Sequence, residues 1–272
     1  MTQKLALKLA VFALLLVLAG GNMFAAPVAC VNGGTLQSYV GLGTTGCSVG
    51  DKIFSNFTDA FTTGHGTLNS NNPGNPVSTA IYVTPLSTSG NYGLAFTYFN
   101  TQSSVAFDQN LTIDIQYLVN VSAPYSITSV YTLTDGGTFA GSSGATVQAT
   151  QNLCLGASFA VNAGGDALNS CTGGTPVTAI AGQNSFALNG TFPMNPSGTI
   201  TLASGQTALG VSDMISLYGG TTNLNSGART AQYDYIANQF IQTQSSGVPE
   251  PATFVLLGSA LLGLGALRRK RA

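Results

Sequence analysis

Leu111-Thr112-Ile113-Asp114-Ile115-Gln116-Tyr117-Leu118-Val119 is the stretch that most clearly specifies the backbone of this chain. Its odd-numbered positions are apolar and its even-numbered positions are mostly polar. Successive side chains of a β-strand point to opposite faces, so this period of two predicts a half-buried strand. The stretch 126–134 alternates in the same way, and it places Ile127, Tyr131 and Leu133 on one face.

Further short runs have the same character and are separated by residues that favour turns. The additional strand candidates are Thr79–Thr84, Tyr92–Phe99, Thr146–Leu153, Ser185–Phe192 and Thr199–Leu202. The turn signals are Asp135-Gly136-Gly137, Asn189-Gly190 and Ser197-Gly198. Three stretches stay open: 35–41, which could form a single helical turn, 213–219 and 232–242. Short strands separated by frequent turn signals predict an all-β fold, an antiparallel β-sandwich of jelly-roll-like type. Helices are expected only in the two terminal segments.

The N-terminus has the order of a secretory signal peptide. Lys4 and Lys8 precede an uncharged apolar run, 9–19, and small residues follow before Cys30. This order predicts an N-terminal signal helix within residues 1–29, which is removed on export. An alternative is a lipoprotein signal with Cys30 acylated, but Pro27 stands where such signals carry leucine.

The C-terminus has three parts: Val248-Pro249-Glu250-Pro251, an uncharged apolar run over 252–267, and Arg268-Arg269-Lys270-Arg271. At about 1.5 Å per residue the apolar run reaches roughly 24 Å, a marginal length for a transmembrane helix. The basic cluster is expected to stay in the cytoplasm. We therefore divide the chain into a signal peptide (1–29), an exported domain (30–243), a linker with the Pro-Glu-Pro motif (244–251), a transmembrane helix (252–267) and a basic tail (268–272).

This tail resembles the PEP-CTERM sorting signal of bacterial exported proteins. The resemblance implies that exosortase, a membrane protease, recognises Pro249, Glu250 and Pro251. It also implies that the basic residues act as a stop-transfer signal; these are Arg268, Arg269, Lys270 and Arg271. The chain would be held in the membrane transiently and then reach the cell surface or the matrix of extracellular polysaccharide. A plain membrane anchor behind a proline linker is the alternative.

The start of the exported region carries a second resemblance. Residues 30–57 contain the pattern Cys…Leu…Tyr…Gly-Cys…Gly-Asp…Phe-Ser-Asn-Phe, between Cys30 and Phe57. This is similar to the opening of a group of PEP-CTERM exported proteins that continue as a β domain. The group has no established activity, so the resemblance implies a domain type and no reaction.

Charge and cysteine content restrict the possible partners. Between residues 27 and 248 the chain has eight aspartates and two basic residues, Lys52 and Arg229. Nucleic acid is therefore not an expected partner, because no basic stripe exists to displace counterions. The four cysteines are Cys30, Cys47, Cys154 and Cys171. An even number in an exported chain predicts disulfides. Three connectivities are possible, and pairing within each sequential pair is the simplest.

The sequence offers little for catalysis. His65 is the sole histidine and lies between two glycines, without a G-x-S-x-G elbow anywhere. Paired carboxylates for glycoside hydrolysis would need Asp108 and Asp114 to meet across a loop. Asp51 and Asp135 occupy turn-like positions, which fit turn formation better than calcium binding. We expect no enzyme activity, no cofactor and no metal site.

Two binding roles compete with a structural or adhesive role in exopolysaccharide. Tyrosines on or near strands could stack on sugar rings; these are Tyr82, Tyr92, Tyr98, Tyr117 and Tyr131. Aromatic residues at strand period are more often core residues. Ice binding would need flat Thr-x-Thr ladders, and only Thr132-Leu-Thr134 and Thr199-Ile-Thr201 fit. We predict a surface or matrix protein, with a lectin-like module as the alternative and ice binding as the weakest.

Overall fold

We analysed a computed structural model of the chain. The residues it describes are 27–63, 81–98, 104–106, 110–138, 144–161, 167–172, 180–188, 195–220 and 229–244. Residues 1–26 of the predicted signal peptide lie outside these residues, as do the transmembrane helix, the Pro-Glu-Pro motif, the basic tail and His65. The last two residues assigned to the signal peptide, Val28 and Ala29, form a strand instead of a helix. Within the described part no helix combines the length and the hydrophobicity that crossing a membrane requires.

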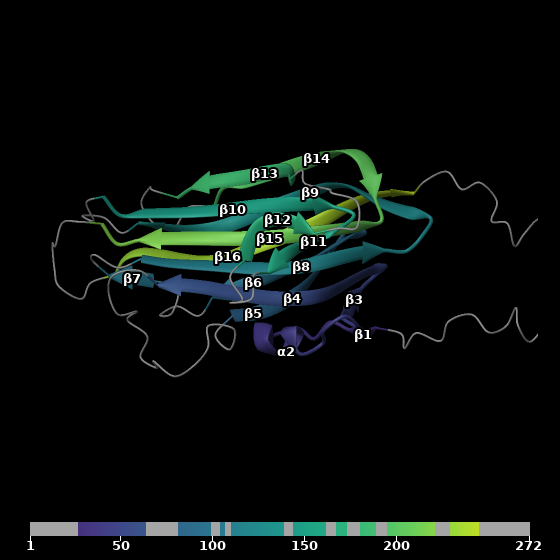
Figure 1. Cartoon of the computed structure of the whole chain (residues 1–272), viewed down its shortest axis with the longest axis horizontal. Helices are drawn as coiled ribbons and strands as arrows, with labels where there is room; N and C mark the ends of the chain where they lie inside the picture. The colour runs from purple at the N-terminus through teal and green to yellow at the C-terminus, as the bar shows by residue number, and fades with distance from the viewer. Residues whose placement is uncertain are drawn as a thin grey trace, which may run out of the picture.

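Two seven-membered layers of strands form a sandwich (Figure 1). The first layer, sheet A, contains in spatial order β1 (Val28–Ala29), β3 (Cys47–Val49), β4 (Lys52–Thr63), β8 (Asn110–Val121), β15 (Ala208–Tyr218), β10 (Thr146–Leu155) and β13 (Ile180–Ala187). The second layer, sheet B, contains β14 (Ser197–Gln206), β9 (Tyr125–Thr138), β16 (Arg229–Gln244), β6 (Asn91–Tyr98), β5 (Ile81–Thr88) and β2 (Gly34–Thr35), with β7 (Ser104–Ala106) beside β16. The predicted β-sandwich is confirmed. All pairs are antiparallel except β1 with β3. The jelly-roll-like detail stays a prediction.

The stretch 111–119 forms the centre of β8, between β4 and β15. Its odd-numbered side chains enter the core between the sheets as predicted; these are Leu111, Ile113, Ile115, Tyr117 and Val119. The expectation of a half-buried strand is wrong in its middle, because Asp114 and Gln116 on the opposite face are also buried. A two-stranded pair, β11 (Ser158–Val161) with β12 (Ala167–Thr172), packs over β8 and β15 there (Figure 1).

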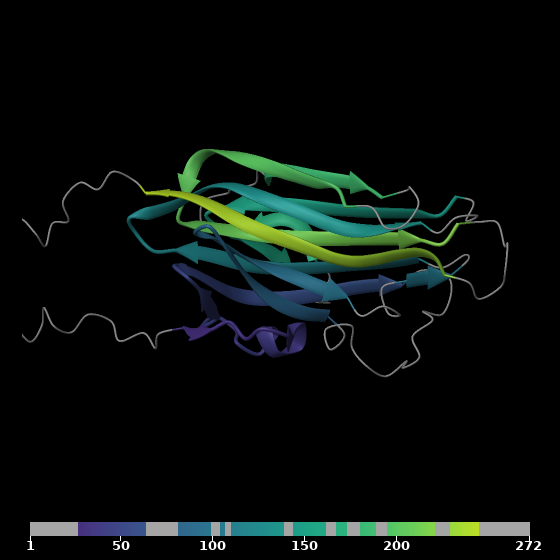
Figure 2. The ribbon, with the colours of Figure 1, turned by 180° about the vertical axis from the view of Figure 1, so that it is seen from behind.

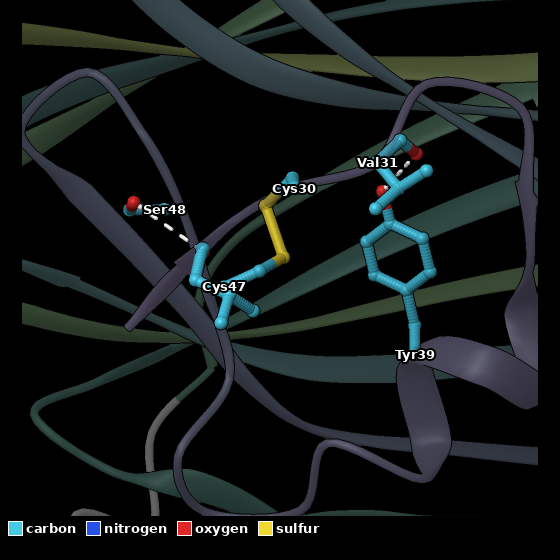
Figure 3. The surroundings of a disulfide bond; sticks show 6 residues. Cys30, Val31, Tyr39, Cys47 and Ser48 are labelled. Carbon is cyan, nitrogen blue, oxygen red and sulfur yellow. Dashed lines mark hydrogen bonds between the residues drawn. A yellow bond between two sulfur atoms is a disulfide. The ribbon is translucent and has the colours of Figure 1, made fainter. Parts of the chain in front are cut away.

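The N-terminal segment closes one edge of the sandwich. β1 pairs with β3 of sheet A, and five residues later β2 pairs with β5 of sheet B. The open stretch 35–41 forms the short helix α2 (Leu36–Val40), whose first turn is capped by the Thr35 hydroxyl accepting from the Ser38 N–H. Leu36 and Tyr39 enter the core, and the Tyr39 hydroxyl donates to the Val31 carbonyl at 2.7 Å (Figure 3).

The cysteines pair within each sequential pair. Cys30–Cys47 lies beside the Tyr39–Val31 contact (Figure 3), where it holds the N-terminal segment to sheet A. Cys154–Cys171 joins β10 to β12, so it ties the β11–β12 pair to sheet A. Since Cys30 is in a disulfide, its thiol is not available for the alternative acylation.

Two turn signals were misread. Asp135-Gly136-Gly137 lies inside β9, where a Cβ at Gly136 would crowd the Tyr233 ring on β16. Ser197 and Gly198 begin β14 instead of preceding it. Asn189-Gly190 lies outside the described residues. The two other open stretches, 213–219 and 232–242, fall almost entirely in β15 and β16, which are among the most buried strands because they pair on both sides.

The two disulfides give a matched test of what stabilises this sandwich, because both span a sequence separation of 17. The chain-entropy model therefore predicts the same loss, about 3 kcal/mol of unfolding free energy, for replacing either pair by alanine. Urea unfolding of the two double variants would measure both losses. A loss near zero for Cys154→Ala with Cys171→Ala would show that β11–β12 is held by packing alone.

Candidate functional site

Tyrosines gather on the outer face of sheet B, which no described element covers. β16 alternates along its length: Ile236, Asn238 and Phe240 enter the core, so Tyr235 and Gln239 point outward. In Figure 2 sheet B faces the viewer, and no described strand or helix lies over it. This differs from sheet A, whose outer face carries the β11–β12 pair.

Strand register brings three tyrosines onto this face. Tyr82 on β5 is opposite Thr97 on β6, and Thr97 is opposite Tyr235 on β16. Because neighbouring strands are about 4.8 Å apart, Tyr82 and Tyr235 stand about 10 Å apart across the sheet. Tyr131 on β9 is opposite Gln239, four residues along β16 from Tyr235. We call Tyr82, Thr97, Tyr131, Tyr235 and Gln239 the tyrosine face.

Small residues separate these aromatic side chains. Ala237 on β16 and Ala95 on β6 occupy outward positions in the row between Tyr235 and Gln239, and Leu133 on β9 lies opposite Ala237 in the same row. Next to Tyr131 on β14 is Thr199, which is exposed. The face thus presents rings, hydroxyls and one amide around Ala95, Ala237 and the half-buried side chain of Leu133. Such groups can stack on and hydrogen-bond to a neutral, hydroxyl-rich ligand.

One carboxyl borders this face. Asp135 is opposite Tyr235, and its Oδ1 is buried without a hydrogen-bond partner among the described residues. Burial raises the pKa of Asp135, and the nearby Asp234 carboxyl adds to this shift. The pKa of Tyr235 is also raised, by burial first and then by Asp135 and Tyr131. Both groups therefore hold their protons more tightly than in water, so the face carries less negative charge.

The predicted set of tyrosines separates into three locations. Tyr82 and Tyr131 lie on the tyrosine face. Tyr98 and Tyr117 are buried in the core, and burial raises their pKa values well above the ordinary range. Tyr92 lies at one end of the sandwich against Lys52. Sequence reasoning missed Tyr235, because its stretch was left open; recognising 232–242 as a strand would have revealed it.

The predicted faces of 126–134 also need correction. A bulge in the pairing of β9 with β16 shifts the alternation, so Ile127 enters the core while Tyr131 and Leu133 face outward. Thr132 and Thr134 are fully buried. They cannot form an exposed threonine ladder, and of the two Thr-x-Thr pairs only Thr199 and Thr201 are exposed.

A polar network crosses the core between the two sheets. Asp213 of sheet A is fully buried and accepts hydrogen bonds from Gln151 at 3.3 Å and from Asn238 of sheet B at 2.5 Å. Asn238 also donates to the Tyr117 hydroxyl at 2.8 Å, and Thr132 donates to Gln151 at 2.6 Å. Burial raises the pKa of Asp213 to about 7, although both amide donors oppose this.

A second buried carboxyl lies on the other side of sheet A. Asp114 accepts from the Ser212 hydroxyl at 2.9 Å and from the Gln116 amide at 3.3 Å. Burial raises its pKa to about 6. Asp114 and Asp213 project from opposite faces of the sheet, so they cannot flank one bond. Asp108, the partner considered for Asp114 in hydrolysis, lies outside the described residues.

The remaining predicted site residues are accounted for as follows. Asp51 contacts Lys52 and Gln242, and Asp135 lies within β9. Among the described residues, no three histidine, cysteine or carboxylate side chains gather as a metal site would require. Pro249, Glu250 and Pro251 lie outside the described residues, as do the stop-transfer residues 268–271.

Comparison with known families identifies one segment. Residues 247–271 match the family described as "PEP-CTERM protein-sorting motif". The chain therefore carries a PEP-CTERM sorting signal at its C-terminus, which indicates an exported protein processed by exosortase. The predicted motif Pro249-Glu250-Pro251 falls inside the matched segment. No curated protein matches the chain.

Solved structures resemble the chain only distantly. The enzymatically active domain of bacteriophage CBA120 tailspike protein 4 is 10% identical with a TM-score of 0.24, covering 72% of this chain and 19% of that one. A family 16 carbohydrate-binding module is 9% identical with a TM-score of 0.23, covering 60% and 85%. The CBM22-1 xylan-binding domain from Paenibacillus barcinonensis Xyn10C is 12% identical with a TM-score of 0.21, covering 82% and 100%. Similarity at this level carries no argument about function.

The two buried carboxyls predict that stability falls as the pH rises. In the folded state Asp213 keeps its proton up to about pH 7 and Asp114 up to about pH 6, whereas in the unfolded chain both lose it near pH 4. Between these limits unfolding releases protons, so each carboxyl lowers stability by up to about 1.4 kcal/mol per pH unit. Urea midpoints should be higher near pH 5 than near pH 8. Asp213→Asn should flatten this dependence, because it removes the carboxyl whose pKa is raised to about 7. A midpoint that rises with pH would contradict the assignment.

Proposed function

We propose that this protein is a component of the cell surface or extracellular matrix, and that it acts there as a structural or adhesive protein in exopolysaccharide. The observation that carries the proposal is the PEP-CTERM motif at 247–271, which follows a disulfide-bonded sandwich. The last described strand ends at Gln244, and only two residues separate it from the matched motif, which begins at residue 247. Cleavage near Pro249-Glu250-Pro251 would therefore release the sandwich with almost no additional chain.

The proposed route assigns a role to each part of the tail. Exosortase recognises Pro249, Glu250 and Pro251, while residues 252–267 hold the chain in the membrane and Arg268–Arg271 stay in the cytoplasm. The membrane is thus a transient partner, before processing. Disulfides are typical of proteins that leave the reducing cytoplasm, and the two in this chain support export.

Processing can be tested with one substitution in the motif. Glu250→Ala in the full chain should leave most of the protein in the membrane fraction, because the charged group between the two prolines is lost. Val248→Ala, beside the motif, should be processed normally. An epitope in the sandwich, followed by fractionation and immunoblotting in a host with and without exosortase, would measure this. Equal release of all three proteins from a host without exosortase would contradict the route.

A second candidate function is carbohydrate binding by the tyrosine face. It is favoured by the register that places Tyr82, Tyr131 and Tyr235 on one face that no described element covers, with Ala95, Ala237 and Leu133 among them. The described side chains there include no basic group, so a neutral polysaccharide is the expected class of ligand.

Tyrosine substitutions separate the lectin-like function from a passive one. Each of Tyr82→Ala, Tyr131→Ala and Tyr235→Ala should weaken binding to the producer's exopolysaccharide several-fold, since losing one stacked ring costs about 1 kcal/mol. Tyr218→Ala is the matched control, because Tyr218 projects from the outer face of sheet A. Co-sedimentation of the processed protein with the polymer would measure affinity. Saturable binding that all four variants retain would exclude this face, and no binding would leave the structural role.

A further inference from the structure

A lysine, a glutamine and an aspartate meet where the two sheets come together at one end of the sandwich. Lys52 begins β4 of sheet A, and Gln242 lies near the end of β16 of sheet B, 190 residues away. The Lys52 amine donates to the Gln242 carbonyl oxygen at 2.6 Å and to Asp51 at 3.2 Å. The Gln242 amide nitrogen donates to the other Asp51 oxygen at 2.6 Å. Three side chains thus form a closed ring of contacts.

The orientation of the Gln242 side chain follows from its partners. With the amide reversed, its NH₂ group would face the lysine donor and its carbonyl would face the aspartate carboxylate. The observed orientation directs the carbonyl to the amine and the amide nitrogen to the carboxylate. Asp51 therefore contacts both nitrogens, the one on Lys52 and the one on Gln242.

Lys52 is held in an unusual environment for a lysine. Its side chain is 0% exposed, whereas lysines are almost never fully buried. The Tyr92 ring covers it, with the amine 5.1 Å from the ring centroid. Gly50 makes room for that ring, because it has a positive φ of 60° and a Cβ there would collide with the ring atoms. Burial lowers the pKa of Lys52, and Asp51 opposes this only in part. The neutral, nucleophilic amine is therefore more accessible than in water.

We propose that Lys52 and Gln242 condense by themselves into an isopeptide crosslink, with Asp51 as the proton carrier. The Lys52 ammonium first transfers one proton to Asp51, which frees the lone pair on Nζ. That lone pair forms a bond to the Gln242 Cδ, and the carbonyl π electrons move to Oε1. Asp51 delivers its proton to the amide nitrogen of Gln242 and accepts a second proton from Nζ. The Oε1 electron pair then restores the carbonyl, the Cδ–Nε2 bond breaks with its electrons remaining on nitrogen, and one ammonia leaves and takes the proton held by Asp51. The step needs no oxidant, reductant or co-reactant.

This crosslink would connect parts of the chain that noncovalent contacts must otherwise hold together. β4 and β16 lie in different sheets, and β16 is the strand that leads directly into the sorting tail. A covalent bond there would connect sheet A directly to the strand that precedes the sorting tail. The inference does not depend on sugar binding or on exosortase.

The chain's mass tests the proposal directly. Full-length protein, expressed with its signal peptide and recovered after export, should be lighter by one ammonia than its sequence requires, after disulfides are reduced. Peptide mapping should find the segment with Lys52 joined to the segment with Gln242. On a reducing denaturing gel the crosslinked chain should run ahead of linear chain, since a 190-residue loop remains closed.

Substitutions at the three positions should each abolish the crosslink. Lys52→Arg keeps the charge but cannot condense, Gln242→Leu removes the acyl group, and Asp51→Asn removes the proton carrier. Gln244→Leu, an exposed position on the same strand, should remain crosslinked. Wild-type protein at full mass, with Lys52 and Gln242 in separate peptides, would overturn the proposal and leave a noncovalent clamp. That measurement does not require any variant to fold.

Discussion

The two sheets must pack face to face, because each contains strands that expose an apolar face when alone. β8, β15 and β16 contribute many of the side chains that meet there, including Tyr117 and Phe240, whose rings are in contact. Asp213 and Asn238 hydrogen-bond across the same interface. A polar pair in an apolar core is costly unless its partners are in place, so this contact favours one alignment of sheet A on sheet B. The alignment also determines which side chains each sheet directs outward, away from the core.

Each end of the chain is connected to this core in a different way. The N-terminal segment crosses from sheet A to sheet B within a few residues and is held by Cys30–Cys47. The C-terminal strand β16 lies inside sheet B, between β9 and β6, and continues toward the sorting signal. A force applied at the tail would therefore act on a strand that is hydrogen-bonded on both sides.

The sandwich has two dissimilar outer faces. Sheet A carries the β11–β12 pair, tied by Cys154–Cys171, and buries Asp114 beneath it. No described strand or helix covers the outer face of sheet B, which presents Tyr82, Tyr131 and Tyr235. Sequence alternation indicated that residues such as Tyr131 and Leu133 share a face, but not which face is buried. A single bulge in the pairing of β9 reversed that assignment relative to Ile127.

The sequence by itself determined those properties that depend only on residues close together in the chain. These are the C-terminal sorting signal, the β class predicted from 111–119 and the even cysteine count, whereas the stretch 35–41 stayed open as a possible helical turn. Only the tertiary structure decided which strands are neighbours, because strand pairing joins residues far apart in sequence. The tyrosine face needed β5, β9 and β16 side by side, and the Lys52–Gln242 contact spans 190 residues. A period of two assigns a side chain to one side of its own strand; its surroundings depend on the partner strand, the register and any bulge.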